Sequence, residues 1–383
     1  MVWAGDHIIS SLGFGTAENY GAVCSGRSGI RLYDARPGIP EPFYASYIDR
    51  TRLDDCFAAA GGNPSDYTPL ERAAILSVVY AAEEARIDLS APDVLFIFSS
   101  TKGNVHLLDE GAEGSGDPRL YLWHTARLIA GYFHNTNEPL VVSGACISGA
   151  CAQVVAMREL ASSRYEYAVV TGADMLSRFI ISGFQSLKAL SPAPCRPFDA
   201  ARNGLNPGES ASTIIYRRTD REDTPCTVEL VRGAIRNDAN HISGPSRTGE
   251  GCFRAIRASL EDLSPDDLAF VCAHGTATAY NDRMEAAALT RAGLHRVPVN
   301  SLKGYFGHTF GAAGVLESIL SVRALADGIV LPTCGFEKGD PEYPLPVADR
   351  ILRTEKSDCL KTLSGFGGCN AALLFRKKIK RKG

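Results

Sequence analysis

Short apolar runs alternate with stretches of helical spacing along most of the chain. The run at 94–98 has the length of a buried strand, and it follows the alanine-rich stretch 70–87, whose apolar positions recur with a helical period. A second buried run lies at 167–172, after a stretch at 150–162 whose apolar residues recur on one side. Further strands are predicted at 139–142 and 212–216. Strands that alternate with helices are typical of parallel sheets covered on both faces.

A similar order of elements recurs in the second half of the chain. The predicted elements there are a strand at 228–235, a helix at 252–260, a strand at 268–272, helices at 282–291 and 314–326, and a strand at 371–375. We therefore expect an α/β fold with an N-terminal half at 1–225 and a C-terminal half at 226–383. The recurrence suggests that the halves arose by an internal duplication.

Composition places the chain among ordinary globular proteins. It has 383 residues, of which 45% are hydrophobic and 22% are charged. These values lack the low hydrophobicity and high net charge of disordered proteins. The formal net charge of −3 argues against binding of nucleic acid or membranes through bulk charge.

Cysteine usage and the N-terminus indicate the compartment. The eleven cysteines are scattered, without a CxxC pair or the Cys/His spacing of a zinc site, and this favours reduced thiols. The first residues show no basic segment followed by an apolar one, so no signal peptide is expected. No apolar run approaches the roughly 18 residues of a transmembrane helix. We therefore expect a cytoplasmic protein.

One cysteine has the sequence context of a nucleophile. Cys146 lies in Ser-Gly-Ala-Cys-Ile-Ser-Gly at 143–149, after a predicted strand and at the start of a predicted helix. Backbone N–H groups at a helix N-terminus favour a thiolate and can bind a developing oxyanion. Cys151 lies deeper in the predicted helix and fits this role less well. The alternative for Cys146 is a buried cysteine without a chemical role, which is common for this residue type.

Two histidines and a lysine lie in glycine-rich loops after strands. His274 follows the strand at 268–272, and Lys303 and His308 follow a short strand at 297–300. Ligands of α/β sheets gather outside the carboxyl ends of the strands, so both loops are candidates for a site. A thiolate could attack an acyl carbonyl there while the imidazoles hold the oxygen of a second carbonyl. Each histidine taken alone is more often structural, but the combination with Cys146 favours chemistry.

These motifs and their order resemble those of β-ketoacyl synthases, the condensing enzymes of fatty-acid and type II polyketide assembly in the thiolase superfamily. The resemblance runs through nearly the whole chain. It rests on Gly-Arg-Ser-Gly-Ile at 26–30, Gly-Ala-Cys-Ile-Ser-Gly at 144–149, Arg-Pro-Phe-Asp at 196–199 with Gly-Glu at 208–209, Asp-Ala-Asn-His-Ile-Ser-Gly-Pro at 238–245, His-Gly-Thr-Ala-Thr at 274–278, Lys303 five positions before His308, and Gly-Phe-Gly-Gly-Cys-Asn at 365–370. Any one of these motifs is a weak signal, whereas all of them in order are a strong one.

The resemblance implies a thiolase-like five-layer αβαβα fold with two pseudo-duplicated halves. Cys146 would take an acyl group from acyl carrier protein as a thioester. Malonyl-loaded carrier protein would then lose CO2 while His274 and His308 hold its thioester oxygen, and the resulting carbanion would attack the acyl group. The backbone N–H groups of Cys146 and Ser364 would form the oxyanion hole.

The resemblance also implies supporting residues. Lys303 would orient the site through a charge contact with Glu285, and Asp282 would support the same region. The residues that would bind substrate are Thr276 and Thr278, which would contact the pantetheine arm, together with Ser243 and Phe366. No metal or redox cofactor is implied, because decarboxylation supplies the carbanion and the phosphopantetheine arrives on the carrier protein.

Departures from the family pattern leave the pathway open. Ser364 stands where the family commonly has a phenylalanine that gates the acyl pocket. Ile147 stands beside the nucleophile where a small polar residue is usual. A housekeeping fatty-acid enzyme and a specialised ketosynthase for polyene or other polyketide chains both fit the sequence.

Other functions and assemblies remain as alternatives. One is a thiolase or a carrier-independent acyltransferase of the same superfamily, and another is a non-catalytic subunit that sets chain length, although such subunits typically lack the nucleophile. We expect a homodimer, with a heterodimer containing a chain-length-factor-like subunit as the alternative. Arg196 and Arg202 are candidates for docking the acidic carrier protein.

Overall fold

The computed structural model describes residues 1–35, 37–108, 116–219 and 228–378. Within these ranges a large mixed sheet has the strand order β11-β10-β14-β15-β9-β1-β8-β7-β5-β6. Its N-terminal strands are β1 (Val2–Ser10), β5 (Val94–Ser99), β6 (Leu140–Val142), β7 (Tyr167–Asp174) and β8 (Ser210–Arg217). Its C-terminal strands are β9 (Val228–Asn237), β10 (Leu268–Cys272), β11 (Val299–Asn300), β14 (Asp358–Gly365) and β15 (Cys369–Lys377).

The two halves of this sheet have the same topology. Numbered along the chain within each half, β6-β5-β7-β8-β1 and β11-β10-β14-β15-β9 both have the order 3-2-4-5-1. In each half the second strand pairs in parallel with the third and fourth. The fifth strand pairs antiparallel with the fourth and the first. The expected duplication is therefore confirmed.

The strand pairing contradicts the expectation of parallel sheets. Each half is mixed and not fully parallel, because its first and fifth strands run antiparallel to their neighbours. The halves meet where Val2 of β1 pairs with Glu229 of β9. The expected boundary between residues 225 and 226 lies outside the described residues, so it stays a prediction.

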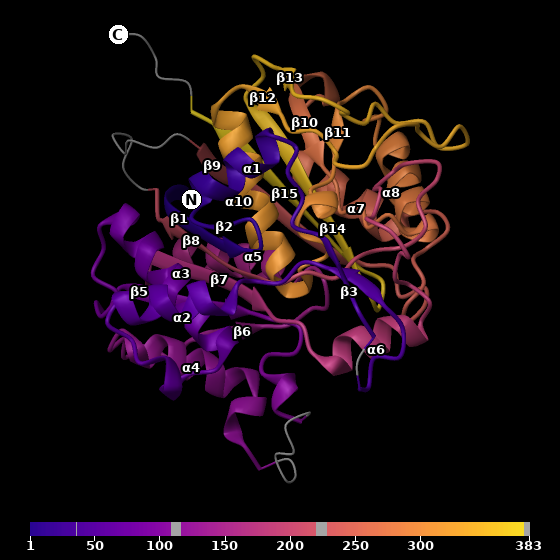
Figure 1. Cartoon of the computed structure of the whole chain (residues 1–383). Coiled ribbons are helices and arrows are strands. Elements are labelled where there is room, and N and C mark those ends of the chain that lie inside the picture. Colours follow the sequence, from indigo (N-terminus) through magenta and orange to yellow (C-terminus); the bar gives the residue numbers. More distant parts are fainter. Residues whose placement is uncertain (36, 109–115, 220–227, 379–383) are drawn as a thin grey trace.

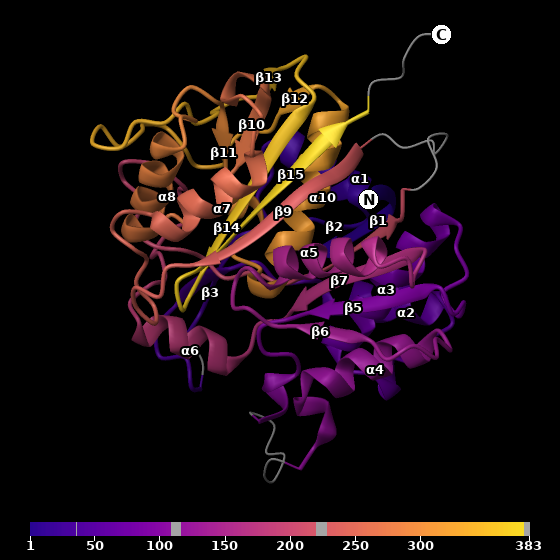
Figure 2. The same ribbon diagram turned by 180° about the vertical axis from the view of Figure 1, so that it is seen from behind.

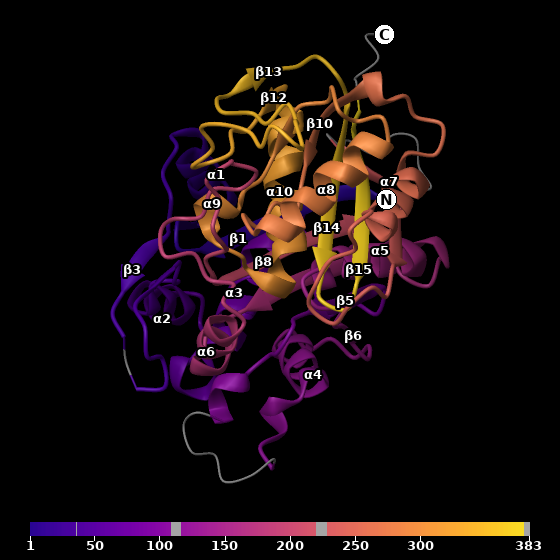
Figure 3. The same ribbon diagram turned by 90° about the vertical axis from the view of Figure 1, so that its right-hand side faces the viewer.

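Helices cover both faces of the sheet (Figures 1 and 2). On the N-terminal half, α3 (Pro69–Ala85) packs on β1, β7 and β8, and on the C-terminal half α7 (Glu250–Leu260) packs on β9 and β15, with α8 (Ala279–Arg291) beside it. Between the halves, α5 (Ser148–Ala161) and α10 (Ala313–Ala326) contact strands of both. Figure 3 shows α10 beside β14, which it contacts. The expected five-layer αβαβα fold is therefore confirmed.

The remaining described elements lie around this framework. They are β2 (Gly13–Phe14), α1 (Thr16–Cys24), β3 (Arg31–Tyr33), β4 (Phe43–Ala45), α2 (Arg50–Ala59), α4 (Leu122–Tyr132), α6 (Arg178–Ser186), α9 (Lys303–Phe306), β12 (Ile329–Val330) and β13 (Leu352–Arg353). Among the residues that the structure describes, no helix combines the length and apolarity needed to cross a membrane.

Two central strands have no clear signal in the sequence. The middle of β1 contains Asp6 and His7, which are both buried. The middle of β14 contains Lys361 and Thr362, whose side chains are completely buried. Polar residues interrupt the apolar run in both strands, which is why hydrophobic patterning does not predict them.

The two middle helices approach each other through glycine. A Cβ atom at Gly314 would clash with the backbone of Ala150 and would lie 2.7 Å from the carbonyl carbon of Gly149. A Cβ atom at Gly149 would lie 2.9 Å from both the Gly311 oxygen and the Val315 nitrogen. Twelve of the fourteen residues of α10 are buried, as expected for a helix enclosed on all sides. The absence of side chains at this crossing therefore sets how closely the N-termini of α5 and α10 can lie.

Replacing Gly314 with alanine should destabilise the protein, because the added methyl group must displace backbone in a densely packed layer. We expect Gly314→Ala to cost about 1–3 kcal/mol of unfolding free energy, measured by urea or thermal unfolding. The matched control is Gly131→Ala in α4, where a Cβ atom would meet nothing within 4 Å. That control should be neutral or stabilising by up to about 1 kcal/mol. Equal stability of the two variants would contradict the close crossing.

Candidate active site

Cys146 lies in the tight turn that joins β6 to α5. The preceding residue, Ala145, has the left-handed φ of 51°, a strained conformation for a residue with a Cβ atom. The Ser148 hydroxyl holds this turn by accepting from the N–H of Gly144 at 2.9 Å and donating to the carbonyl of Ala145 at 2.6 Å. Cys146 itself is only 9% exposed. The turn thus fixes the thiol two residues before the first helical residue, as the sequence predicts.

The protonation of Cys146 results from opposing influences. Burial raises the pKa of the thiol, while the ammonium groups of Lys102 and Lys303 and the backbone N–H of Phe366 lower it, and the carboxylate of Asp174 raises it further. The net direction is upward. A helix N-terminus favours the thiolate, so it offsets only part of the burial effect. The resting cysteine is therefore a thiol that must lose its proton to react.

The loop after β10 carries His274 and is held from behind by two carboxylates. Glu285 accepts hydrogen bonds from the backbone N–H groups of His274 and Gly275, at 2.8 and 2.7 Å. Asp282 accepts one from the N–H of Thr276 at 2.9 Å. Both acids lie on α8, so this helix sets the position of the imidazole through the backbone.

His308 follows α9 and faces His274. The two ring centroids are 5.2 Å apart with the rings nearly perpendicular, and His308 also packs on Phe310 at 4.8 Å. The Nδ1 atoms of both histidines are buried without a hydrogen-bond partner among the described residues. Burial, followed by the charges of nearby lysines, lowers the pKa of both imidazoles well below the ordinary value. Both rings are therefore neutral near pH 7.

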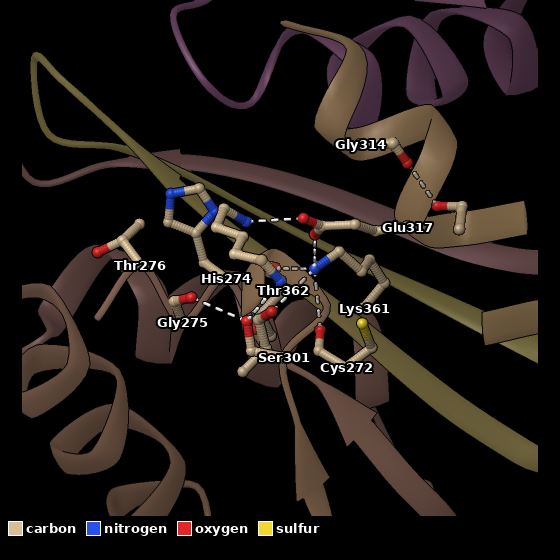
Figure 4. A network of polar contacts seen from close by, with 12 residues as sticks. Cys272, His274, Gly275, Thr276, Ser301, Gly314, Glu317, Lys361 and Thr362 are labelled. Atoms are coloured by element: carbon tan, nitrogen blue, oxygen red, sulfur yellow. Dashed lines mark hydrogen bonds and ion pairs between the residues drawn. The ribbon is translucent and has the colours of Figure 1, made fainter. Parts of the chain in front are cut away.

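The charge contact of Lys303 differs from the one expected. Lys303 Nζ lies 2.7 Å from Glu317 Oε1 on α10, and not on Glu285, whose oxygens are taken by the backbone of the His274 loop. A second lysine, Lys361, lies 2.6 Å from the other oxygen of Glu317. Figure 4 shows Glu317 and Lys361 side by side, to the right of His274. We call Lys303, Glu317 and Lys361 the buried charge cluster.

The three candidate catalytic side chains line one cavity. Cys146, His274 and His308 share a pocket of about 490 Å³. The other predicted residues that line it are Thr276, Thr278, Ser243, Ser364 and Phe366. The structure thus brings residues of both halves together as the sequence predicts, whereas Glu285 and Asp282 lie behind the His274 loop. In the described part of the chain, no group of three or more His, Cys, Asp or Glu side chains could hold a metal ion.

Two aromatic side chains form part of the cavity wall near the nucleophile. Phe366 is 41% exposed and stacks on Phe184, with ring centroids 5.9 Å apart. The Ser364 hydroxyl, at the expected gate position, donates instead to Asn370 Oδ1 at 2.7 Å and is nearly buried. Phe366 and Phe184 are therefore the side chains placed to narrow this side of the cavity.

The two arginines considered for carrier docking are engaged with acidic residues. The side chain of Arg202 is 4% exposed and pairs with Asp340 at 2.9 Å, so it is not available on the surface and this prediction is wrong. The side chain of Arg196 is 30% exposed and pairs with Glu337 at 2.8 Å. Arg196 stays a candidate only if that ion pair opens.

Sequence reasoning missed three charged residues near the cavity. Glu317 and Lys361 are buried charges within apolar elements, and each is recognisable as a charge that interrupts a hydrophobic run. Lys102 follows the carboxyl end of β5, the strand equivalent to β10, and its ammonium lies 4.4 Å from the Phe310 ring centroid. The general rule that sites form at strand ends would have drawn attention to Lys102.

The chain is similar to known ketosynthases in sequence and in fold. The family model "Beta-ketoacyl synthase, N-terminal domain" matches residues 97–221, and "Beta-ketoacyl synthase, C-terminal domain" matches residues 228–337. The tetracenomycin polyketide synthase ketoacyl synthase alpha subunit of Streptomyces glaucescens is 30% identical over 96% of this chain and 95% of its own. Nodulation protein E of Rhizobium leguminosarum bv. trifolii is 33% identical, but the match spans only 62% of this chain and 61% of the relative. The solved structure of the ishigamide ketosynthase/chain length factor has a TM-score of 0.88 and 26% identity, and the match covers 99% of both chains.

Replacing Lys102 with methionine should raise the pKa of the Cys146 thiol, because a cation that favours the thiolate is removed. The midpoint of the alkylation rate against pH, measured with iodoacetamide and located by peptide mass spectrometry, should therefore move to higher pH. Lys188→Met is the control, since Lys188 is an exposed cation at the same cavity and should leave the midpoint in place. An unchanged profile in the Lys102 variant would show that its charge does not reach the sulfur.

Proposed function

The chain belongs to the β-ketoacyl synthase family, and on this premise we propose that it catalyses the decarboxylative Claisen condensation of malonyl-loaded carrier protein with an acyl group held on Cys146. The observation that carries the proposal is the convergence of Cys146, His274 and His308 on one cavity. The thiol comes from the N-terminal half and the two imidazoles come from the C-terminal half. A nucleophile beside two uncharged hydrogen-bond donors suits an acyl transfer followed by a carbanion attack.

The first step would load the acyl group. Cys146 attacks the thioester of acyl carrier protein, and its proton leaves to a neutral imidazole or to the departing thiolate. The N–H of Cys146 is one donor for the tetrahedral oxyanion. The resemblance implies Ser364 as the second donor. The backbone N–H of Phe366 lowers the pKa of the Cys146 thiol, and this favours Phe366 as the donor instead. A Cβ atom at Gly365 would lie 3.1 Å from the Cys146 nitrogen. Glycine at position 365 therefore leaves room for an oxyanion at the N–H of Cys146.

The second step would generate and use the carbanion. Nothing described accepts a hydrogen bond at Nδ1 of His274 or His308, so each neutral ring does best to carry its proton on Nε2. Two Nε2–H groups can then hold the malonyl thioester oxygen as CO2 leaves and negative charge develops on it. The carbanion attacks the acyl carbonyl on Cys146, and the thiolate departs. Thr276, Thr278 and Ser243 lie along the cavity where they would contact the phosphopantetheine arm.

We further propose that no resident metal or redox cofactor takes part. The electron pair of the new carbon–carbon bond comes from the broken bond to CO2, so the step needs no external oxidant or reductant. The partners are acyl carrier protein in its acyl- and malonyl-loaded forms and a second subunit in the cytoplasm. That subunit is either a second copy of this chain or a protein like the ishigamide chain length factor.

A thiolase mechanism would use a second cysteine as acid and base. The candidate is Cys369, the first residue of β15, whose thiol is near enough to Cys146 to be affected by its charge. Its Sγ contacts the carbonyl oxygens of Gly144 and Phe366 at 3.5 and 3.3 Å. Burial, and then the charge of Cys146, raises the pKa of Cys369 to about 11. A thiol so weakly acidic is a poor proton shuttle near neutrality, which supports the condensing activity over the thiolase alternative.

Removing the thiol should abolish acyl loading and leave the malonyl chemistry. With acyl carrier protein as donor, intact-mass spectrometry should show an acyl adduct on the unmodified protein and on Cys24→Ala, and none on Cys146→Ala. Condensation should fall by about 10³-fold or more in Cys146→Ala. Cys146→Gln should still release CO2 from malonyl-loaded carrier protein, since both imidazoles remain.

Cys369→Ser separates the two mechanisms. The condensing mechanism predicts activity within a few-fold of the unmodified protein, because Cys369 does not exchange protons with substrate. Loss of activity in Cys369→Ser with acyl loading intact would favour a thiolase. An acyl adduct that persists on Cys146→Ala would contradict the assignment of the nucleophile.

A further inference from the structure

The buried charge cluster holds one more cation than its carboxylate can balance. Lys303 Nζ and Lys361 Nζ lie 2.7 and 2.6 Å from the two oxygens of Glu317, and all three side chains are at most 3% exposed. With both lysines charged, the cluster has a net charge of +1. Figure 4 shows Lys361 between Glu317 and Cys272, which is close to His274 along the chain. A single Lys303–Glu317 pair would already be neutral, so the second lysine calls for an explanation.

Lys361 also ties down the strand that carries His274. Its ammonium donates to the carbonyls of Cys272 and Ala273 at 3.1 Å each, and to that of Thr362 at 2.9 Å. Cys272 pairs with Lys361 in the parallel register of β10 and β14. Cys272 and Ala273 are the last two residues before His274. The lysine therefore fixes the end of β10 from the side opposite to Glu285.

We propose that Lys361 is a positioning residue of the condensation: it anchors the strand end that leads to His274 and supplies a second buried positive charge, which adds to burial in favouring neutral imidazoles and favours the anion formed on decarboxylation. This inference rests on the function proposed above. Burying a second ammonium group beside one carboxylate carries a desolvation penalty that an apolar residue at the same position in the strand would avoid. The buried charge is explained if it serves the reaction in the adjoining cavity.

The pKa shifts of the groups in and around the cavity have the direction that this role requires. Both histidines have their pKa lowered by burial first, and then by the charges of Lys303 and Lys361, with His308 acting on His274 and Lys102 acting on His308. Burial alone would raise the pKa of Glu317, but the two lysines reverse this and hold it below the ordinary value. Other charged or titratable groups on the surrounding elements include Asp282 on α8, Asp174 at the end of β7, Cys146 before α5 and His241 in the cavity wall. Cys272 at the end of β10 and Glu285 on α8 act on Lys361 itself. Glu285 and Asp174 direct their oxygens to backbone N–H groups and hydroxyls, away from the rings.

Lys361→Met tests the inference in the full-length protein, because it removes the charge and leaves the Lys303–Glu317 pair intact. Without the cation, protonation of the imidazoles costs less, so the rings become charged at higher pH and lose the neutral donor form. The acid limb of the pH–rate profile for CO2 release from malonyl-loaded carrier protein should therefore move to higher pH, so that the variant loses most activity, relative to the unmodified protein, at the acid end of the profile. Lys361→Arg, which keeps the charge, should restore the limb.

The matched control is Lys356→Met. Lys356 Nζ donates to the carbonyl of Leu268 at 3.1 Å, at the opposite end of β10, so its loss removes a similar tie far from the imidazoles. The control should leave the acid limb in place. Where Lys361→Met does not fold, Lys361→Gln keeps a donor for the carbonyls of the strand end without the charge, and it should show the same displaced limb.

Two results would overturn the inference. A neutral Lys361 variant with a lowered thermal midpoint and an unmoved acid limb would reduce Lys361 to a structural role. A selectively labelled histidine titration by NMR that finds the same His274 pKa with and without Lys361 would do so as well. Absence of CO2 release from the unmodified protein would instead contradict the proposed function, so the two failures are distinguishable.

Discussion

The contact between the N-termini of α5 and α10 at Gly149 and Gly314 is the constraint on which the site depends. Cys146 comes just before α5 in one half, and His308 comes just before the segment that leads into α10 in the other. The two halves repeat one strand order, so β6 and β11 are equivalent strands and the loops after them meet across the middle layer. A nucleophile and its imidazole partners can therefore come from segments far apart along the chain and still share one cavity.

Burial determines the resting protonation states of the reacting groups in this cavity. Burial raises the pKa of the Cys146 thiol and lowers the pKa of both imidazoles, so all three groups are uncharged at rest. Two sources of charge act on them: the buried charge cluster and the partly buried Lys102. In a medium of low polarity such charges act more strongly than in water. The site is thus prepared for the negative charge of an oxyanion or enolate before substrate arrives.

The sequence predicts the reacting groups well and their supports poorly. Cys146, His274 and His308 are recognisable because each follows a strand within a local motif. Five of the ten described α-helices and several strands follow from apolar spacing. The partner of Lys303 could not be predicted, because Glu317 reaches it from a different helix and only the packing of α10 decides the pairing. β14 was missed for a related reason. Its central Lys361 interrupts the apolar run, and only the structure shows the carboxylate and the three carbonyls that surround it.

The most direct test of the account is a condensation assay with two loaded carrier proteins and mass-spectrometric readout. With an acyl-loaded carrier and a malonyl-loaded carrier, the account predicts CO2 release together with a 3-oxoacyl carrier product that is two carbons longer than the acyl donor. Loss of His274 or His308 should remove both signals while Cys146 still accepts the acyl group. Acyl loading without any CO2 release or elongated product, under conditions where both carriers bind, would contradict it.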